Sequence, residues 1–600
     1  MAKETTPATR AEIDPQYKWN LEDIYENQAA WDKDAEDIKA LTGELVQLAG
    51  HLGDSAENLL KALRLSDDIN ERASRLLNYA HRKRDEDNTI SEYQALADRG
   101  LALLIETESA RSFFVPEVLA MPEDRIKGFL AENEDLRLYT FLLNEMLRHK
   151  AHILSAAEER LLAMAGEMAE APDQIFTMFN DADTRFPKVK DEDGNEVELT
   201  HGRYGSLIES RNRDVRKNVF EAFLPTYRKH INTLSATFSA NVKKDMFYAR
   251  ARNYGSAREA ALDDDNVPLS VYDNLIDAVH EALPKLHDYL RLRKRVLGLD
   301  ELHMYDLYTP LVPDLHLQIP YDEAVKTVKT ALRPLGEKYG EVATKAFNSR
   351  WVDVYETPGK ASGAYSAGVY GVHPYILLNY QDRMSDVFTV AHELGHTMHS
   401  YFSSEAQPFV YANYTIFVAE VASTCNEALL LHHLLQQSTD KQTRAYLLNF
   451  QLERLRATLF RQTMFAEFEK LAHQYATEGG ALTPEWLCAT YYELNQQFFG
   501  PVCDVDKDIE LEWARIPHFY NSFYVYKYAT GISAATALSQ QILTEGQPAV
   551  DRYLKFLQSG GSDYPIEQLK LAGVDMTSPD PVRTTIDLFA KQTEELGQLL

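Results

Sequence analysis

The chain has 600 residues and a net charge of −29, with 91 acidic against 62 basic side chains. Hydrophobic residues make up 45% of the sequence and charged residues 26%, which is ordinary for a globular protein and excludes disorder as the default interpretation. Such an acidic chain repels phosphate backbones and anionic lipids, so neither nucleic acid nor a membrane surface is an expected partner.

The cysteine content and the N-terminal sequence bear on location. Cys425, Cys488 and Cys503 form no CxxC pair, which fits a reducing compartment and argues against a thiolate zinc site. No window approaches 18 uncharged apolar residues, and the opening MAKETTPATRAEIDPQ lacks the apolar stretch of a secretory signal. We therefore expect a cytoplasmic protein that does not span a membrane.

Most of the chain has the composition and periodicity of helices. Residues 28–114 are rich in Ala, Leu, Glu and Arg, contain few Gly or Pro, and repeat apolar positions at helical spacing. Residues 122–180 continue this pattern, with helix starts expected near Pro122 and Ser155. The sequence therefore predicts a mainly α fold.

Three breaks interrupt the helical pattern. In residues 186–200, two short alternating runs flank Asp193-Gly194, a dipeptide suited to a hairpin turn. A second irregular region covers roughly residues 300–322 and contains three prolines. The third, residues 351–380, holds four glycines and ends in a strand-like run at residues 375–379. We predict a small β-sheet there, next to the helix that follows.

That helix carries a metal-binding motif. Residues 390–399 read VAHELGHTMH and contain H-E-x-x-H. Residues four apart share one face of a helix, so the imidazoles of His392 and His396 can bind one zinc ion. Glu393 can then take a proton from the attacking water. Apolar residues at 4-3-4-3 spacing form a stripe on the other side, so the helix can offer its histidines to a cleft, with Gly395 leaving room beside them.

A third ligand has to come from elsewhere. His399 shares the histidine face but lies seven residues, roughly 10 Å, beyond His392, so one straight helix cannot place three imidazoles on bonds of about 2.0–2.1 Å. The apolar segment 416–431, IFVAEVASTCNEALLL, carries Glu420 and Glu427 on one face. A carboxylate in such a setting is costly unless paired or metal-bound. We expect Glu420 to be the third ligand and Glu427 to orient a ligand histidine.

Several motifs together resemble the M3 metallopeptidases of the oligoendopeptidase F type. They are HELGH, the following FVAEVASTCNE, WNLEDIY at residues 19–25, the HPYILLNY strand, and IPHFYNSFYVYKYATG at residues 516–531. The resemblance spans nearly the whole chain. It implies an elongated, mostly helical fold with a deep channel that holds one zinc ion (Zn2+) and admits short oligopeptides but excludes folded proteins.

The resemblance also implies roles for individual residues. The zinc ligands would be His392, His396 and Glu420, and the catalytic residues would be Glu393, His518, Tyr520 and Tyr526, with Tyr524 as a rival for the tyrosine role. An edge strand would pair with the substrate backbone through Tyr375, Ile376, Leu377, Leu378 and Asn379. The expected domains are an N-terminal helical region (1–115), an oligopeptidase F-type helical domain ending in the hairpin (116–202), and a catalytic domain (203–600).

Two other functions are compatible with a zinc site. A zinc carboxypeptidase on a related helical fold would remove single residues from a free C-terminus. A peptide-binding protein would use zinc only structurally, but structural sites close four protein ligands and have no need of a base such as Glu393. Nothing in the sequence indicates an oligomeric state.

Overall fold

The computed structural model describes residues 8–313, 315 and 317–600. Residues 1–7 lie outside this described part; they open the N-terminal stretch in which we expect no secretory signal. Residues 314 and 316, in the predicted irregular region, lie outside it as well. The chain divides into two compact units. Unit 1 contains Met1–Ile153, His316–Leu430 and Leu538–Gly573, and unit 2 contains Leu154–Leu315, Leu431–Ala537 and Val574–Leu600.

Unit 1 consists of helices and one small sheet. Its N-terminal part contains α1 (Gln28–Val46), α2 (Ala56–Glu86), α3 (Ser91–Arg111), α4 (Phe114–Ala120), α5 (Glu123–Glu132) and α6 (Thr140–Arg148). Its central part contains α15 (Tyr321–Ala331), α16 (Gly336–Asn348), β4 (Val352–Asp353), β5 (Tyr365–Ala367), β6 (Tyr375–Leu377), α17 (Met384–Ala406), α18 (Phe409–Ala412) and most of α19 (Ile416–Gln437). The end of α23 (Tyr526–Glu545), with α24 (Gln547–Leu557) and α25 (Pro565–Leu571), completes it.

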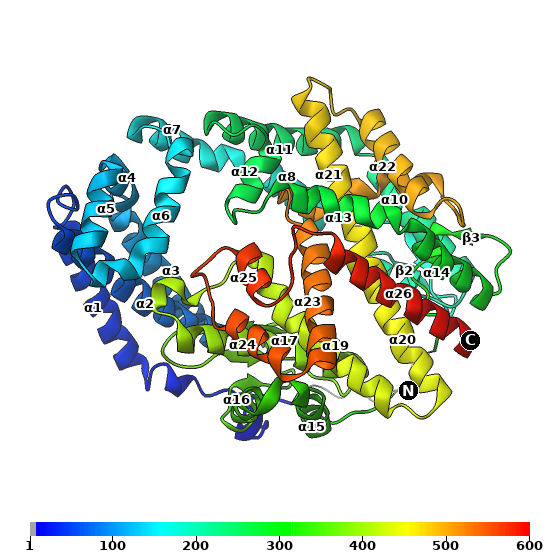
Figure 1. Cartoon of the computed structure of the whole chain (residues 1–600). Coiled ribbons are helices and arrows are strands. Elements are labelled where there is room, and N and C mark those ends of the chain that lie inside the picture. The colour runs from blue at the N-terminus through cyan, green and yellow to red at the C-terminus, as the bar shows by residue number, and fades with distance from the viewer. Residues whose placement is uncertain (1–7, 314, 316) are drawn as a thin grey trace. The chain divides into compact units, whose positions relative to one another are not determined.

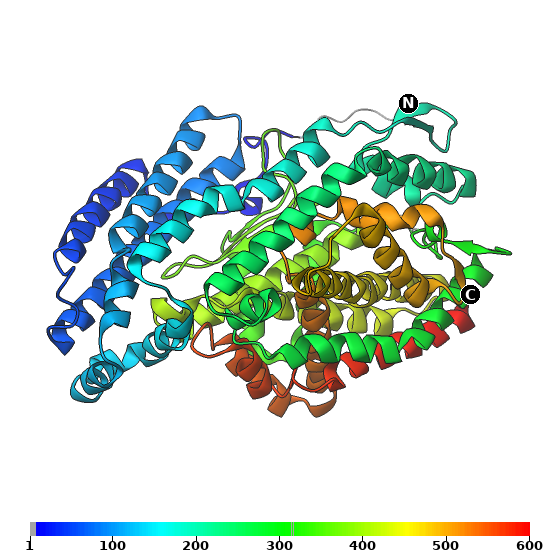
Figure 2. The ribbon, with the colours of Figure 1, turned by 90° about the horizontal axis from the view of Figure 1, so that it is seen from above.

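The helices α1, α2 and α3 pack side by side, as the blue ribbons of Figures 1 and 2 show. Asn27 caps α1 and Ser55 caps α2, each accepting a hydrogen bond from a backbone N–H of the first turn. The apolar faces of these helices bury one core, which also includes Tyr375 and Leu377 of β6. Burial of a large apolar side chain is worth about 1.5–3 kcal/mol, so this core ties the sheet to the helices.

The sheet of unit 1 has the strand order β4-β6-β5, which makes β6 its central strand. β4 runs parallel to β6 with Val352 opposite Ile376, and β5 runs antiparallel with Ser366 opposite Ile376. All three residues of β6 are buried. The predicted sheet beside the H-E-x-x-H helix is thereby confirmed.

Unit 2 is also mainly helical. Before residue 315 it contains α7 (Ala156–Ala169), α8 (Ala171–Thr177), β1 (Lys188–Lys190), β2 (Glu196–Glu198), α9 (His201–Ile208), α10 (Arg213–Arg228), α11 (Ile231–Ala251), α12 (Ala257–Asp263), α13 (Leu269–Glu281), α14 (Leu283–Val296) and β3 (Leu302–His303). Later come the end of α19, then α20 (Lys441–Leu455), α21 (Gln462–Thr477), α22 (Pro484–Phe499), β7 (Cys503–Asp504), most of α23 and α26 (Asp580–Leu599).

The predicted hairpin and helix starts are found in the structure. β1 and β2 form an antiparallel hairpin, and Gly194 in its turn has a φ of +82°, a conformation that favours glycine. α5 follows Pro122, and α7 follows Ser155, whose hydroxyl caps the helix. The prediction of a mainly α fold is confirmed.

Candidate active site

His392, His396 and Glu420 come together between two helices of unit 1. The histidines lie on α17 and the glutamate on α19. The two histidine Nε2 atoms are 3.2 Å apart. Oε2 of Glu420 is 3.3 Å from Nε2 of His392 and 3.6 Å from Nε2 of His396. Three potential ligand atoms thus form a nearly equilateral triangle.

The size of this triangle fits a bound zinc ion. Two ligands at about 2.0–2.1 Å from one tetrahedral zinc ion lie about 3.3–3.4 Å apart. The observed separations are 3.2, 3.3 and 3.6 Å. Two imidazole nitrogens and one carboxylate oxygen are also a donor set found in catalytic zinc sites, which leave the fourth position open. The residues therefore fit a metal of this kind.

A glycine brings the two helices close enough to form the triangle. A Cβ atom on Gly395 would lie 2.5 Å from the Cα of Ser423 in α19, which is closer than real Cβ atoms approach another heavy atom. The side-chain amide of Asn426 on α19 donates to the carbonyl of Ala391 on α17 at 3.1 Å. The helices accordingly lie side by side in Figure 1. The sequence suggested that Gly395 leaves room beside the imidazoles. In the structure, the space at Gly395 is filled by the backbone of α19 instead.

Glu427 orients the first histidine. Its Oε1 is 2.6 Å from Nδ1 of His392, and because a carboxylate only accepts, Nδ1 donates and Nε2 is left facing Glu420. Burial is the largest single effect and lowers the pKa of His392, but the hydrogen bond to Glu427 and the charges of the neighbouring glutamates together outweigh it, so the pKa is raised. Burial would raise the pKa of Glu420, yet His396 and His392 lower it to about 2. Glu420 is therefore an anion at neutral pH.

Glu393 has the environment of a base. It is 6% exposed, and its Oε2 has no hydrogen-bond partner among the residues that the structure describes. Burial raises the pKa of Glu393, and the neighbouring His392 and His396 oppose this rise. A carboxyl with a raised pKa accepts a proton more readily than an ordinary glutamate does, which suits proton transfer near neutral pH.

The expectation that α17 offers all its histidines to a cleft is wrong for His399. This residue is 1% exposed, and its ring stacks on Tyr414 with 3.6 Å between centroids and 2° between planes. Burial lowers the pKa of His399 to about 3, so the ring is neutral. The segment after α17 folds back over this side of the helix, which the helical pattern alone does not reveal.

The predicted edge strand is a central strand instead. On one side, the N–H of Ile376 donates to the carbonyl of Trp351 at 2.9 Å, and on the other side β5 pairs with β6. Residues 375–377 therefore have no free edge for a substrate. The strand order β4-β6-β5 makes β4 and β5 the two edge strands, and among the described residues β5 pairs only with β6, so its outer edge is free of strand pairing.

β5 lies against α17, the helix that carries the H-E-x-x-H motif. The hydroxyls of Ser366 and Thr397 of α17 are 2.8 Å apart. Because the N–H of Ile376 points toward β4, Ser366 opposite it forms a non-hydrogen-bonded pair, and its own N–H and C=O face the free edge. The sequence signal for this strand is weak: it is a short run between Gly363 and Gly368.

In unit 2, His518 groups with two tyrosines. Its Nε2 is 3.2 Å from the hydroxyl oxygen of Tyr528, and its ring stacks on Tyr524 with 6.2 Å between centroids. The two tyrosine rings meet edge to face at 5.4 Å. Burial and the charge of Arg461 lower the pKa of His518, so the imidazole is neutral at pH 7 and keeps one N–H to donate.

The two tyrosines preferred from the sequence lie in the core of unit 2. Tyr520 is 8% exposed and stacks on Phe176 at 4.4 Å. Tyr526 is fully buried, with its ring 5.0 Å from that of Tyr272. Burial raises the pKa of both hydroxyls. The structure therefore brings the rival, Tyr524, together with His518.

A second group could in principle hold a metal. Glu301, His303 and Asp504 lie together at β3 and β7 of unit 2. Nδ1 of His303 is 2.9 Å from Asp506, but both carboxylates of the group are exposed to solvent. This group therefore fits a metal less well than the half-buried group of α17 and α19.

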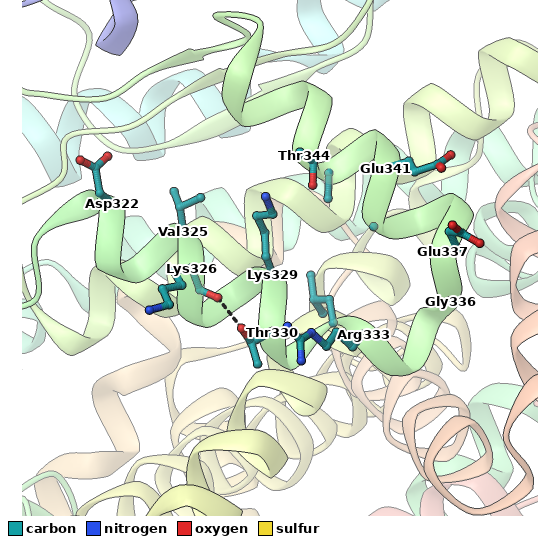
Figure 3. A pocket seen from close by; sticks show the side chains of 13 residues that line it. Asp322, Val325, Lys326, Lys329, Thr330, Arg333, Gly336, Glu337, Glu341 and Thr344 are labelled. Atoms are coloured by element: carbon teal, nitrogen blue, oxygen red, sulfur yellow. Dashed lines mark hydrogen bonds between the residues drawn. The ribbon is translucent and has the colours of Figure 1, made fainter.

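A surface groove between α15 and α16 of unit 1 has a volume of about 840 Å³ (Figure 3). Its charged lining includes Lys326, Lys329 and Arg333 on one side and Glu337 and Glu341 on the other. Four of these residues are exposed and Lys329 is half-buried, and none belongs to the triangle of ligand atoms. The groove is therefore separate from the candidate active site.

An H-E-x-x-H helix joined by a glutamate from a second helix defines a metallopeptidase site. The sequence profile of Peptidase family M3 matches residues 206–588, and that of Oligopeptidase F matches residues 117–186. The Bacillus subtilis oligopeptidase PepF is 49% identical over 591 residues, which cover 98% of this chain and 88% of that protein. An oligoendopeptidase F of Lactococcus lactis subsp. cremoris is 41% identical over 592 residues, 98% of each chain.

Solved structures give the same result. Oligoendopeptidase F from Enterococcus faecium is 37% identical, with a TM-score of 0.74 over 95% of this chain and 98% of that one. A protein from Chlamydophila abortus is 36% identical, with a TM-score of 0.93 over 99% of this chain and 100% of that one. The chain belongs to peptidase family M3 and is a metalloendopeptidase. The resemblance to oligoendopeptidase F is confirmed, and the family implies a metal cofactor.

Proposed function

We propose that this protein is a zinc-dependent endopeptidase that hydrolyses internal bonds of short oligopeptides, with one zinc ion per chain. The observation that carries this proposal is the triangle of His392, His396 and Glu420, with sides of 3.2–3.6 Å, beside the buried base Glu393. Imidazole ligands at tetrahedral spacing favour zinc over magnesium or calcium, which prefer oxygen ligands.

The residues divide the work of hydrolysis. His392, His396 and Glu420 would hold the zinc ion, which when bound acts as a Lewis acid that activates a water molecule and polarises the scissile carbonyl. Glu393 takes a proton from the attacking water. The same carboxyl then delivers this proton to the leaving amine as the C–N bond breaks. Glu427 holds His392 in the tautomer whose Nε2 is a ligand.

The tetrahedral oxyanion needs further donors. We assign these to the N–H of His518, which the resemblance implies, and to the hydroxyls of Tyr524 and Tyr528, because these two tyrosines group with His518 in unit 2. In comparable sites one such donor is worth about 2.7–4 kcal/mol. The sequence pointed instead to Tyr520 and Tyr526. Both are buried, which favours Tyr524 and Tyr528 as the donors.

The substrate backbone would pair with β5. An extended peptide can add to a free sheet edge through main-chain hydrogen bonds, which depend little on its sequence. The N–H and C=O of Ser366 offer such an edge next to α17. The restriction to short peptides rests on the resemblance and on two related proteins, of which the one from Bacillus subtilis is named an oligopeptidase and the one from Lactococcus lactis an oligoendopeptidase.

Location and other partners are part of the same proposal. None of the described helices is long and apolar enough to cross a membrane. The three cysteines form no disulfide, and Cys425 and Cys503 are buried. Together with the net charge of −29, these features support a cytoplasmic enzyme without nucleic-acid or membrane partners.

Mass spectrometry of peptide digests tests this function. End-blocked peptides of graded length are incubated with the wild type, with Glu393→Gln and with Glu405→Gln, a control for loss of an exposed charge on the same helix. We expect internal cuts in short peptides by the wild type and the control, and none by Glu393→Gln. Loss of terminal residues from free peptides alone would favour the carboxypeptidase. Bound zinc without any cleavage would favour the peptide-binding protein.

A further inference from the structure

A tight turn links the proposed oxyanion donors of unit 2. Residues 521–525 connect the short 3-10 helix Pro517–Tyr520, which contains His518, to α23, which contains Tyr528. Tyr524 lies in the turn itself. Phe523 has a φ of +61°, a left-handed conformation that is strained for a bulky side chain. Such a conformation persists only where neighbouring groups hold it.

A buried carboxyl on another helix holds this residue. Oε1 of Glu469, on α21, accepts a hydrogen bond from the N–H of Phe523 at 3.0 Å. Glu469 is fully buried, and its Oε2 has no hydrogen-bond partner within the described part of the chain. A carboxyl in this position is costly and adds nothing to the packing of α21 that an apolar side chain would not add. Its specific contact is with the turn.

Two further side chains hold the same turn from other sides. The side-chain amide of Asn241, on α11, donates to the carbonyl of Phe519 at 3.1 Å and lies 3.2 Å from the hydroxyl of Ser522. The ring of His473, one helical turn beyond Glu469, packs on the ring of Phe523 at 4.5 Å. The start of the turn and its strained residue are therefore fixed by the buried part of unit 2.

We propose that Glu469 is a positioning residue for peptide hydrolysis, which fixes the strained turn through Phe523 and thereby keeps Tyr524 and Tyr528 grouped on His518. This inference rests on the proposed function, in which these side chains stabilise the oxyanion. Glu469 touches none of the reacting atoms. It acts through the backbone of the turn.

The carboxyl can hold the turn in its neutral form. Burial raises the pKa of Glu469 well above its usual range, and the nearby Asp245 raises it further, while the hydrogen bond from Phe523 opposes this. The carbonyl oxygen of a neutral carboxyl accepts the N–H as a glutamine side chain would. Glu469→Gln should therefore preserve the contact, whereas the nearly isosteric, apolar Glu469→Met removes it and keeps the volume of the core filled.

Hydrogen exchange and steady-state kinetics on the full chain test the inference. In Glu469→Met we expect the peptide that contains Phe523 to exchange about tenfold faster. We also expect kcat to fall about tenfold or more, with KM within about twofold. Glu469→Gln should recover exchange and most of kcat. The control is Thr463→Val on the same helix, because within the described part of the chain its buried hydroxyl bonds only to the carbonyl of Leu459, one helical turn away.

A double-mutant cycle separates positioning from general destabilisation. If Glu469 acts through the tyrosine group, Glu469→Met should cost much less kcat in a Tyr528→Phe background than in the wild type. If Glu469→Met fails to fold, Ser522→Ala loosens the same turn from its half-buried side and should lower kcat by about two- to fivefold.

The outcomes against the inference are distinct. Unchanged exchange at Phe523, or faster exchange with wild-type kcat, overturns it. A loss in Glu469→Gln as large as in Glu469→Met, or fully additive losses in the cycle, also overturns it. If Tyr524→Phe, Tyr528→Phe and His518→Ala all keep the wild-type kcat, the oxyanion assignment is itself wrong and the inference falls with it, whatever the exchange data show for Glu469.

Discussion

Oε1 of Glu427 lies 2.6 Å from Nδ1 of His392, across the contact between α19 and α17. Because Glu427 can only accept, this bond keeps the ring hydrogen on Nδ1 and turns the free electron pair of Nε2 toward Glu420. Glu420 and Glu427 are seven residues apart on one helix, so a single helix face supplies one proposed ligand and the group that orients another.

Glu427→Gln should weaken metal binding by about 10–100-fold, because a glutamine oxygen is a weaker acceptor and no longer raises the basicity of His392. Competition with a chromogenic chelator measures the zinc affinity directly. Glu405→Gln removes a charge from the exposed pair with Lys338 and should leave the affinity unchanged. Equal affinities of Glu427→Gln and the wild type would contradict the orienting role.

Gly395→Ala should disrupt the site, because its Cβ would lie 2.5 Å from the backbone of Ser423 and has to push α19, with Glu420, away from the histidines. Overpacking of this kind typically lowers the free energy of unfolding by about 1–3 kcal/mol. We expect weaker metal binding and a lower unfolding midpoint in denaturant. Gly340→Ala is the matched control, since no atom lies within 4 Å of a Cβ there. Similar behaviour of the two variants would show that the close approach is not needed.

The helices and the grouping of the potential metal-ligating residues could be predicted because most of their determinants are local. Helical periodicity and caps such as Ser155 act within a few residues, and zinc binding by one helix requires histidines at positions i and i+4. Glu420 could be found because a carboxylate on an apolar helix needs a partner. The sequence could not show that Gly395 faces the backbone of α19, because that contact joins segments far apart in the chain.

The surroundings of the strand and of the tyrosines could not be predicted because their neighbours are distant in the sequence. An apolar run predicts a strand at Tyr375, but only the pairing of β4 on one side and β5 on the other makes it central. Likewise, four tyrosines in eleven residues do not reveal that Tyr526 packs on Tyr272 while Tyr524 stacks on His518. Strand order and ring contacts follow from tertiary packing, which local patterns do not contain.

Ser366→Pro should weaken substrate binding, because it removes the one N–H of β5 that faces the free edge of the sheet. Proline is tolerated at such an edge position, where no ladder bond is lost. The loss of one hydrogen bond of about 0.5–1.5 kcal/mol predicts a rise in KM of about 2–10-fold with little change in kcat. Ser366→Ala loses only the contact with Thr397 and keeps the N–H. An unchanged KM in Ser366→Pro would remove β5 from the substrate site.

A buried charge cluster in unit 2 predicts how stability depends on pH. Glu512 is 4% exposed, with one oxygen 2.7 Å from Arg461 and the other 2.5 Å from the hydroxyl of Tyr491. Burial would raise the pKa of Glu512, but Arg461 and Arg515 lower it to about 2. The unfolded value is about 4.3, so the stabilisation is fully present above that pH and is lost as the pH falls toward 2.

Glu512→Gln should therefore lower the free energy of unfolding by about 3–5 kcal/mol at pH 7, because it leaves two arginines without their buried partner. The difference from the wild type should shrink by about 1 kcal/mol at pH 3.5, where the unfolded carboxylate is already protonated. Urea unfolding at pH 7, 5 and 3.5 measures both values. Glu123→Gln, in an exposed pair with Lys127, should cost at most about 1 kcal/mol at each pH. A difference for Glu512→Gln that stays constant down to pH 3.5 would mean that the carboxylate titrates alike in the folded and unfolded chain, and that the arginine cluster does not lower its pKa.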